Sequence, residues 1–319
     1  MVTTEIKKGL ANLEVFSATL QALAETDKDL YVVTSDSRGS GKLVPFGQRY
    51  PDQIVEIGIA EQNLVGVAAG LASMKKKAFA VSPACFLTAR ALEQIKNDVC
   101  YSDNAVKLIG ISAGVSYGAL GTTHHSLHDY AVLRAINNIS IVAPADNFET
   151  EQAIRTAAKM DSPIYLRFGK KNMPENLAPD DGSFLIGKGR VLSEGNDFVF
   201  FATGEAVWPC VEAAQLLHEK YNLSATVVSM HTIKPLDTNL IKRLASAGKP
   251  VITVEEHSVY GGLGEAIASF MMQEGLHNKL KIVGIPDEHT VHGSQNEIFK
   301  HYGLSAEGLM NTAISMIRP

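Results

Sequence analysis

Apolar and polar positions along the chain follow two alternating periods. Short apolar runs at 30–34, 54–59, 78–82, 106–112, 140–143 and 162–168 are typical of buried strands. Between these runs, apolar residues recur at helical spacing, most clearly from Leu64 to Leu71. Strands that alternate with helices predict a parallel sheet with helices packed on its faces.

The same alternation returns in the second half of the chain. Strands are expected at 198–203, 225–230, 250–255 and 281–285, and helices at 207–221, 237–247, 263–274 and 305–317. The stretch between the halves is rich in Pro, Asp and Asn, which is typical of a linker. We therefore expect an α/β fold of two parallel-sheet domains, at 1–172 and 185–319, joined by a linker at 173–184.

Composition argues against several classes of function. A net charge of -5 over 319 residues gives no footprint for nucleic acid or for an anionic membrane. No apolar run is long enough to span a bilayer, and the first residues lack the apolar core of a signal peptide. The three cysteines are scattered without metal-ligand spacing, so we expect free thiols in a cytoplasmic enzyme and no metal site in this chain.

Glu61 stands where a strand-like run meets a helix, and two interpretations are open. A carboxylate in the first turn of a helix is favoured by the helix dipole, which is the more frequent case. Alternatively, Glu61 is a buried carboxylic acid held against a cofactor nitrogen, because burial disfavours the charged form.

Three polar segments follow predicted strands of the first domain. The loop 35–41 contains Gly and Ser, the loop 113–129 is Gly-rich and holds three histidines, and 167–172 carries several cations. Loops at the carboxyl ends of parallel strands are where α/β folds bind ligands, although each could be a solvated turn. The histidines lack the Cys or carboxylate partners that would complete a zinc site.

Two stretches carry a family resemblance. GIAEQNLVGVAAGLA at 58–72 resembles the transketolase segment that holds the catalytic glutamate of thiamine diphosphate enzymes. FLTARALEQIKND at 86–98 resembles the segment whose aromatic ring stacks on the cofactor's aminopyrimidine. The resemblance implies that Glu61 donates a proton to that pyrimidine, that Phe86 stacks on it, and that Ile59 also contacts the cofactor.

The same resemblance implies the substrate contacts. His124, in a Gly-Thr-Thr-His sequence, would bind substrate oxygens and move protons, and further residues would bind the substrate and its phosphate: Ser40, Ser112, Arg167 and Lys170. Transketolases usually carry an aspartate four residues before this histidine, where Leu120 stands here. A leucine cannot hydrogen-bond a sugar hydroxyl, so we expect an unusual or branched sugar phosphate.

Full-length transketolases begin with a domain that binds the diphosphate through a divalent cation, using a Gly-Asp-Gly stretch and an asparagine. This chain contains no such pattern. We therefore expect a split transketolase, in which an N-terminal subunit supplies Mg²⁺ or a similar ion and the two subunits share thiamine diphosphate. The resemblance implies a homodimer of this chain within a heterotetramer, and no activity for this chain alone.

The implied reaction is transfer of a two-carbon ketol unit from a ketose phosphate to an aldose. Three alternatives stay open. The β subunit of a 2-oxo-acid dehydrogenase shares the domains and the glutamate. Deoxyxylulose-phosphate synthase is a near neighbour, but it is normally one chain and keeps the aspartate. A non-catalytic relative would keep the fold and the dimer surface only.

Overall fold

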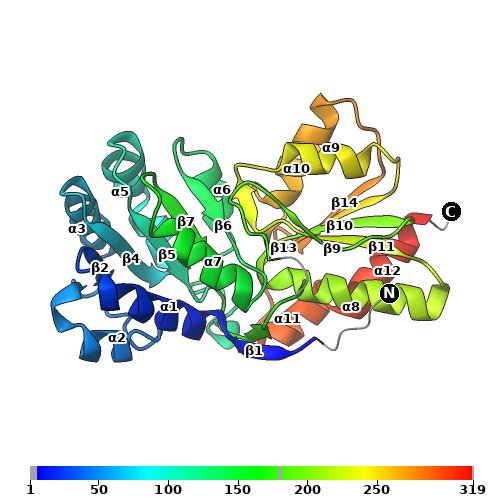
Figure 1. Ribbon diagram of the computed structural model, residues 1–319. Helices are drawn as coiled ribbons and strands as arrows, with labels where there is room; N and C mark the ends of the chain where they lie inside the picture. The colour runs from blue at the N-terminus through cyan, green and yellow to red at the C-terminus, as the bar shows by residue number, and fades with distance from the viewer. Residues whose placement is uncertain (1–5, 179–181, 318–319) are drawn as a thin grey trace.

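The computed structural model describes residues 6–178 and 182–317. Within them the chain forms two large sheets that lie side by side, and one two-stranded sheet (Figure 1). The larger sheet has seven strands in the order β12-β6-β7-β5-β4-β2-β3. Their bounds are β2 Leu30–Thr34, β3 Ile54–Glu56, β4 Lys77–Pro83, β5 Lys107–Ile111, β6 Ser140–Val142, β7 Ile164–Arg167 and β12 Thr232–Lys234.

All neighbours in this sheet are parallel except β12, which pairs antiparallel with β6 although it belongs to the second half of the chain. The helices of this half are α1 Asn12–Thr26, α2 Val44–Arg49, α3 Glu61–Ser73, α4 Ala84–Arg90, α5 Leu92–Gln94, α6 Asp129–Arg134 and α7 Asn147–Ala157. One apolar core lies beneath α1, α2 and α7, and another lies beneath α3, α4 and α6 on the opposite face. The sheet is thus covered on both faces, as predicted.

The second sheet has five strands in the order β14-β13-β10-β11-β9, and only β9 is antiparallel to its neighbour. Its strands are β9 Arg190–Ser193, β10 Phe198–Ala202, β11 Ala225–Ser229, β13 Val251–Ser258 and β14 Leu280–Ile285. Its helices are α8 Val207–Tyr221, α9 Thr238–Ala245, α10 Leu263–Gln273, α11 Gln295–His301 and α12 Ala306–Ile317. Helices α8, α11 and α12 enclose a core on one face, while α9 and α10 share the core of α3 and α4. The two halves are therefore packed through a common apolar core.

Local sequence signals account for where several helices begin. The Asp146 carboxylate accepts the backbone N–H of Glu149 and caps α7, a position that aspartate favours. In α3, the helical spacing predicts a buried face, and Leu64, Ala68 and Ala72 are buried; Val65 is buried as well, whereas Leu71 is half-buried. Gly66 and Gly70 leave open space beside α3, so within the described residues no other element uses the close approach that these glycines permit.

Some elements differ from the prediction. The stretch 86–98, given above only for its family resemblance, falls on α4, α5 and a π-helical turn, Ile95–Tyr101. The predicted linker overlaps β8, Asn172–Pro174, which pairs with β1, Lys8–Ala11, and its residues 179–181 lie outside the described part. Short single-turn helices are Pro51–Gln53, Gly118–Leu120 and Gly204–Ala206. Of the helices described, none is long and apolar enough to cross a membrane.

Candidate active site

The carboxyl ends of the parallel strands bring four segments to one edge of the seven-stranded sheet. These are the turn from β3 into α3, the turn from β4 into α4, the loop after β5 and the loop after β7. Such an edge is where open α/β sheets bind ligands. The side chains predicted to act in chemistry are therefore placed by the fold on one side of the molecule.

Glu61 is the first residue of α3, and only 4% of it is exposed. Its carboxylate is paired with Arg90, whose Nη1 lies 2.9 Å from Oε1 and 3.1 Å from Oε2. The Arg90 side chain is 51% exposed and belongs to the last residue of α4. Burial of Glu61 agrees with the second interpretation of the sequence. The arginine partner was not predicted, and it gives the Glu61 carboxylate a charge-assisted pair of hydrogen bonds.

Phe86, on α4, lies between Arg90 and the histidine loop. The Arg90 Cζ is 4.4 Å from the centroid of the Phe86 ring, and the ring meets the His124 imidazole edge to face at 5.3 Å. A cavity of about 460 Å³ opens beside these groups. It is lined by Cys85, Phe86, Ala89, Arg90, Thr122, Thr123, His125, Leu127 and His128. A flat ring could enter this cavity and contact Phe86.

His124 is held by its own loop. Its backbone N–H donates to the Gly121 carbonyl at 2.9 Å, and its Nδ1 lies 2.9 Å from the Thr123 hydroxyl. Its imidazole also meets the Tyr117 ring edge to face at 5.2 Å, and the Lys170 Nζ lies 4.6 Å from the centroid of that ring. Glu61, Phe86, His124 and Lys170 are thus connected by contacts through Arg90 and Tyr117, neither of which was predicted.

The other predicted residues have different surroundings. Ser112 is buried and adopts a positive φ of 52°. Burial raises the pKa of the neighbouring Tyr117, and the Ser112 hydroxyl partly offsets this rise. Ser40 is half-buried, and its hydroxyl donates to the Ser37 carbonyl at 3.2 Å. Ile59 and Leu120 are 74% and 56% exposed, so their apolar surfaces are available to a ligand or another chain.

Arg167 is not placed to bind a substrate. Only 5% of it is exposed; its Nε donates to Asp129 at 2.8 Å, and its Nη2 donates to the carbonyls of Ser126 and Glu256. Burial opposes the charge of Asp129, but Arg167, His257 and the Tyr165 hydroxyl together outweigh it and lower the pKa of that carboxyl. The predicted phosphate role of Arg167 is therefore replaced by a structural one, because its donors are used inside the protein.

The second half of the chain reaches the histidine loop, which the sequence did not indicate. Glu256 of β13 accepts the N–H of Val115 at 2.9 Å, and Gln295 donates to Glu256 and to Glu205 at 2.8 and 2.7 Å. Burial, together with the nearby Glu205, raises the pKa of Glu256 to about 7. These buried contacts fix the start of the loop that carries His124.

His292 contacts the same loop further along. A Cβ added at Gly121 would lie 2.5 Å from the His292 Nε2, and Gly121 has φ 73°. The positive φ strains any residue other than glycine at position 121, and a β-carbon there would also displace the exposed His292 imidazole. Since the Gly121 carbonyl holds the N–H groups of His124 and His125, the packing of His292 bears on the position of His124.

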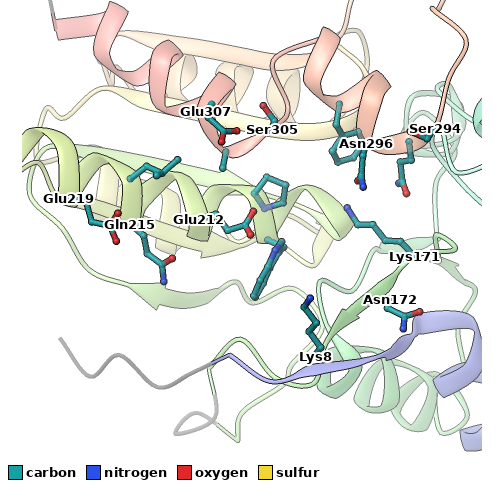
Figure 2. A pocket seen from close by; sticks show the side chains of 16 residues that line it. Lys8, Lys171, Asn172, Glu212, Gln215, Glu219, Ser294, Asn296, Ser305 and Glu307 are labelled. Atoms are coloured by element: carbon teal, nitrogen blue, oxygen red, sulfur yellow. The ribbon is translucent and has the colours of Figure 1, made fainter.

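A second cleft, of about 860 Å³, lies between the β1–β8 pair and helices α8, α11 and α12 (Figure 2). Lys171 enters this cleft, where its Nζ is 4.7 Å from the Phe299 ring and 4.0 Å from Glu205. Neighbouring Lys170 instead lies over Tyr117 beside His124. The two lysines that follow β7 therefore point to different places, and Lys170 is the one that faces the candidate active site.

Comparison with known proteins identifies the family. The description "Transketolase, pyrimidine binding domain" matches residues 8–176, and "Transketolase, C-terminal domain" matches residues 187–309. The chain belongs to the transketolase family. This confirms the predicted family and the predicted two-part α/β fold. Membership of this family implies dependence on thiamine diphosphate.

Transketolase relatives match the chain over nearly its whole length. One of the subunits of the apulose-4-phosphate transketolase of Phocaeicola vulgatus is 45% identical over 303 residues, which are 95% of this chain and 96% of the relative. The "Putative transketolase C-terminal section" of Methanocaldococcus jannaschii is 38% identical over 92% of both chains. A structure described as "Split gene transketolase, inactive beta4 tetramer" has a TM-score of 0.87 and 34% identity, and the match covers 96% and 98% of the two chains. The interpretation as a transketolase-type C-terminal subunit is confirmed.

The residues at the Glu61 corner fit the aminopyrimidine half of thiamine diphosphate. The buried carboxylate accepts hydrogen bonds from a planar N–H group, and the Phe86 ring lies against that same group. Since a guanidinium already satisfies both side chains, another flat nitrogen-bearing group can do so. Among the described residues, no group of three or more His, Cys, Asp or Glu side chains is arranged to hold a metal ion.

Proposed function

We propose that this chain is the C-terminal subunit of a split, thiamine diphosphate-dependent transketolase, and that it transfers a two-carbon ketol unit between sugar phosphates. The observation that carries the proposal is the set of contacts from Glu61 through Phe86 and His124 to Lys170. It brings four groups to one edge of the sheet. The buried carboxyl and the aromatic ring would serve the cofactor, and the imidazole and the cation would serve the sugar phosphate.

Glu61 and Phe86 form the cofactor side of the proposed site. Glu61 would exchange a proton with the pyrimidine ring at one carboxyl oxygen, while Phe86 and Ile59 would offer apolar contacts to that ring. When bound, thiamine diphosphate supplies a nucleophilic carbon and an electron sink for breaking the bond beside the substrate carbonyl. The buried position of Glu61 keeps water away from the shared proton.

His124 and Lys170 form the substrate side. The Thr123 hydroxyl engages the Nδ1 of His124, which leaves Nε2 to exchange a proton with a substrate oxygen. The ammonium group of Lys170 attracts the substrate phosphate, and Ser40 and Ser112 offer hydroxyls from neighbouring loops. Tyr117 contacts both His124 and Lys170, so it links these two side chains.

A separate N-terminal subunit completes the site in this proposal. It binds the diphosphate through Mg²⁺ or a similar ion, for which this chain has no recognisable motif. Exposed Ile59 and Leu120 and the open face beside Gly66 and Gly70 offer surfaces for other chains. We propose a heterotetramer of two copies of each subunit in the cytoplasm. The split-gene relative whose β4 tetramer is described as inactive supports the need for the partner.

Apulose 4-phosphate is the proposed ketose, since two relatives at 45% and 40% identity carry that name. Leu120 supports a substrate that differs from the common ketoses. It is exposed on the single-turn helix Gly118–Leu120, between Tyr117 and His124, and presents no hydrogen-bonding group to a sugar hydroxyl.

The proposal is tested by mixing this chain with its separately purified N-terminal subunit, thiamine diphosphate and Mg²⁺. We expect ketol transfer from apulose 4-phosphate to an aldose phosphate in the mixture, and none with either subunit alone. Omitting one component at a time provides the controls. Decarboxylation of a 2-oxo acid with a lipoyl acceptor, without ketol transfer, would contradict the proposal and favour the dehydrogenase β subunit.

A further inference from the structure

The Arg90 guanidinium makes the two contacts expected of the cofactor's aminopyrimidine. It donates from Nη1 to both oxygens of the Glu61 carboxylate, at 2.9 and 3.1 Å. It also lies over the Phe86 ring, with Cζ 4.4 Å from the ring centroid. A guanidinium is planar, delocalised and rich in N–H donors, so it resembles the edge and the face of an aminopyrimidine.

Two groups cannot occupy one place. We infer that Arg90 is a placeholder for the aminopyrimidine: its guanidinium keeps Glu61 and Phe86 in position, and the cofactor must displace it to bind. This inference rests on the proposed function and adds a positioning residue to it.

Exposure makes the displacement feasible. The Arg90 side chain is 51% exposed, whereas Glu61 is 4% exposed. The long stem of an arginine at the end of a helix can turn toward water, where its charge is hydrated again. Glu61 stays inside, because it is the first residue of α3, whose Leu64, Val65 and Ala68 are also buried.

Displacement also changes the electrostatics around Glu61. Within residues 6–178 and 182–317, Arg90 is the only cation paired with this carboxylate. Once the guanidinium leaves, Glu61 is a buried carboxyl without a cationic partner, and leaving it unpaired would be costly. The same movement that admits the pyrimidine therefore gives Glu61 a reason to hydrogen-bond to it.

Arg49 provides a matched control. It also ends a short helix, α2, it pairs with Glu25 at 3.1 Å, and its Cζ lies 5.3 Å from the centroid of the Tyr50 ring. Its side chain is 54% exposed, close to the value for Arg90. Arg49→Ala removes the same kinds of contact without touching Glu61 or Phe86.

The test measures thiamine diphosphate affinity by calorimetry in the reconstituted two-subunit enzyme with Mg²⁺. We expect Arg90→Ala to lower Kd by about fivefold to thirtyfold, since one half-exposed ion pair and one cation–π contact no longer compete. Arg49→Ala should leave Kd within twofold of the wild type. Arg90→Gln, which keeps a polar stem without the charge, should also tighten binding and serves if the alanine variant folds poorly.

A second readout uses the full chain alone, with the aminopyrimidine half of thiamine as the probe. We expect nuclear magnetic resonance titration to detect tighter binding to Arg90→Ala than to the wild type. Unchanged or weaker binding of the cofactor and of this probe in both Arg90 variants would overturn the inference and make Arg90 a residue that holds the bound cofactor. If the wild-type enzyme fails to bind thiamine diphosphate, the proposed function itself is wrong.

Discussion

Replacing Arg167 by methionine should destabilise the protein without acting as a substrate-binding mutation. The guanidinium pairs with fully buried Asp129 at 2.8 Å, donates to two backbone carbonyls and lies 4.5 Å from the centroid of the Tyr130 ring. Removing one partner of such a buried pair costs about 3–5 kcal/mol, because the remaining carboxylate is uncompensated. For a protein of this size that corresponds to a fall in Tm of roughly 5–15 °C.

Thermal unfolding of the purified chain measures this fall, and KM for the ketose phosphate is measured with the reconstituted enzyme. A double variant, Asp129→Asn with Arg167→Met, should recover at least half of the lost stability, since the neutral amide needs no cation and its oxygen can still accept from Tyr165. The structural role of Arg167 is refuted if Arg167→Met leaves Tm unchanged and raises KM tenfold or more.

Three further predictions concern the substrate side and its support. Lys170→Met should raise KM for the ketose phosphate about tenfold with little change in kcat. Lys171, which points into the other cleft, provides the control, and Lys171→Met should leave KM within twofold. Equal effects of the two substitutions on KM would contradict the phosphate-binding role of Lys170. Gly121→Ala should lower kcat/KM more than tenfold in the turnover assay, because the positive φ and the His292 imidazole force the histidine loop to move; wild-type turnover would disprove this. The pKa of buried Glu256 is raised to about 7, so the folded protein binds this proton more tightly than the unfolded chain, and the stability from this group is lost as pH rises from about 4.5 to 7. Urea denaturation at pH 5 and pH 8 should therefore show a smaller loss of stability for Glu256→Gln than for the wild type, and an identical loss would contradict the account.

The sequence alone was sufficient for features that depend on short, local signals. The alternation of apolar strands with amphipathic helices predicted both parallel sheets, because each strand and helix shows its own period. Glu61, Phe86, His124 and Lys170 were predicted one segment at a time, each at the carboxyl end of a strand. The structure then places them in one chain of contacts, since parallel strands deliver their following loops to the same edge.

Features that depend on distant parts of the chain were missed. Arg90 ends α4, and nothing in its local sequence indicated its contact with Glu61, which lies 29 positions away. Glu256 supports the histidine loop across 141 positions. Arg167 was misassigned because a cation at the end of a strand has the same local pattern whether it binds a phosphate or a buried aspartate. Strand β12 was missed because Thr232–Lys234 contains only one apolar residue and so forms no apolar run.

The central claim is that Glu61 is the proton donor of a thiamine diphosphate site completed by a second subunit. Turnover of apulose 4-phosphate by the reconstituted pair, measured with cofactor occupancy determined in the same samples, tests it most directly. For Glu61→Gln the account predicts a loss of at least about 100-fold in kcat, the scale of a general acid, while the cofactor remains bound. A kcat within threefold of the wild type at full occupancy would contradict it.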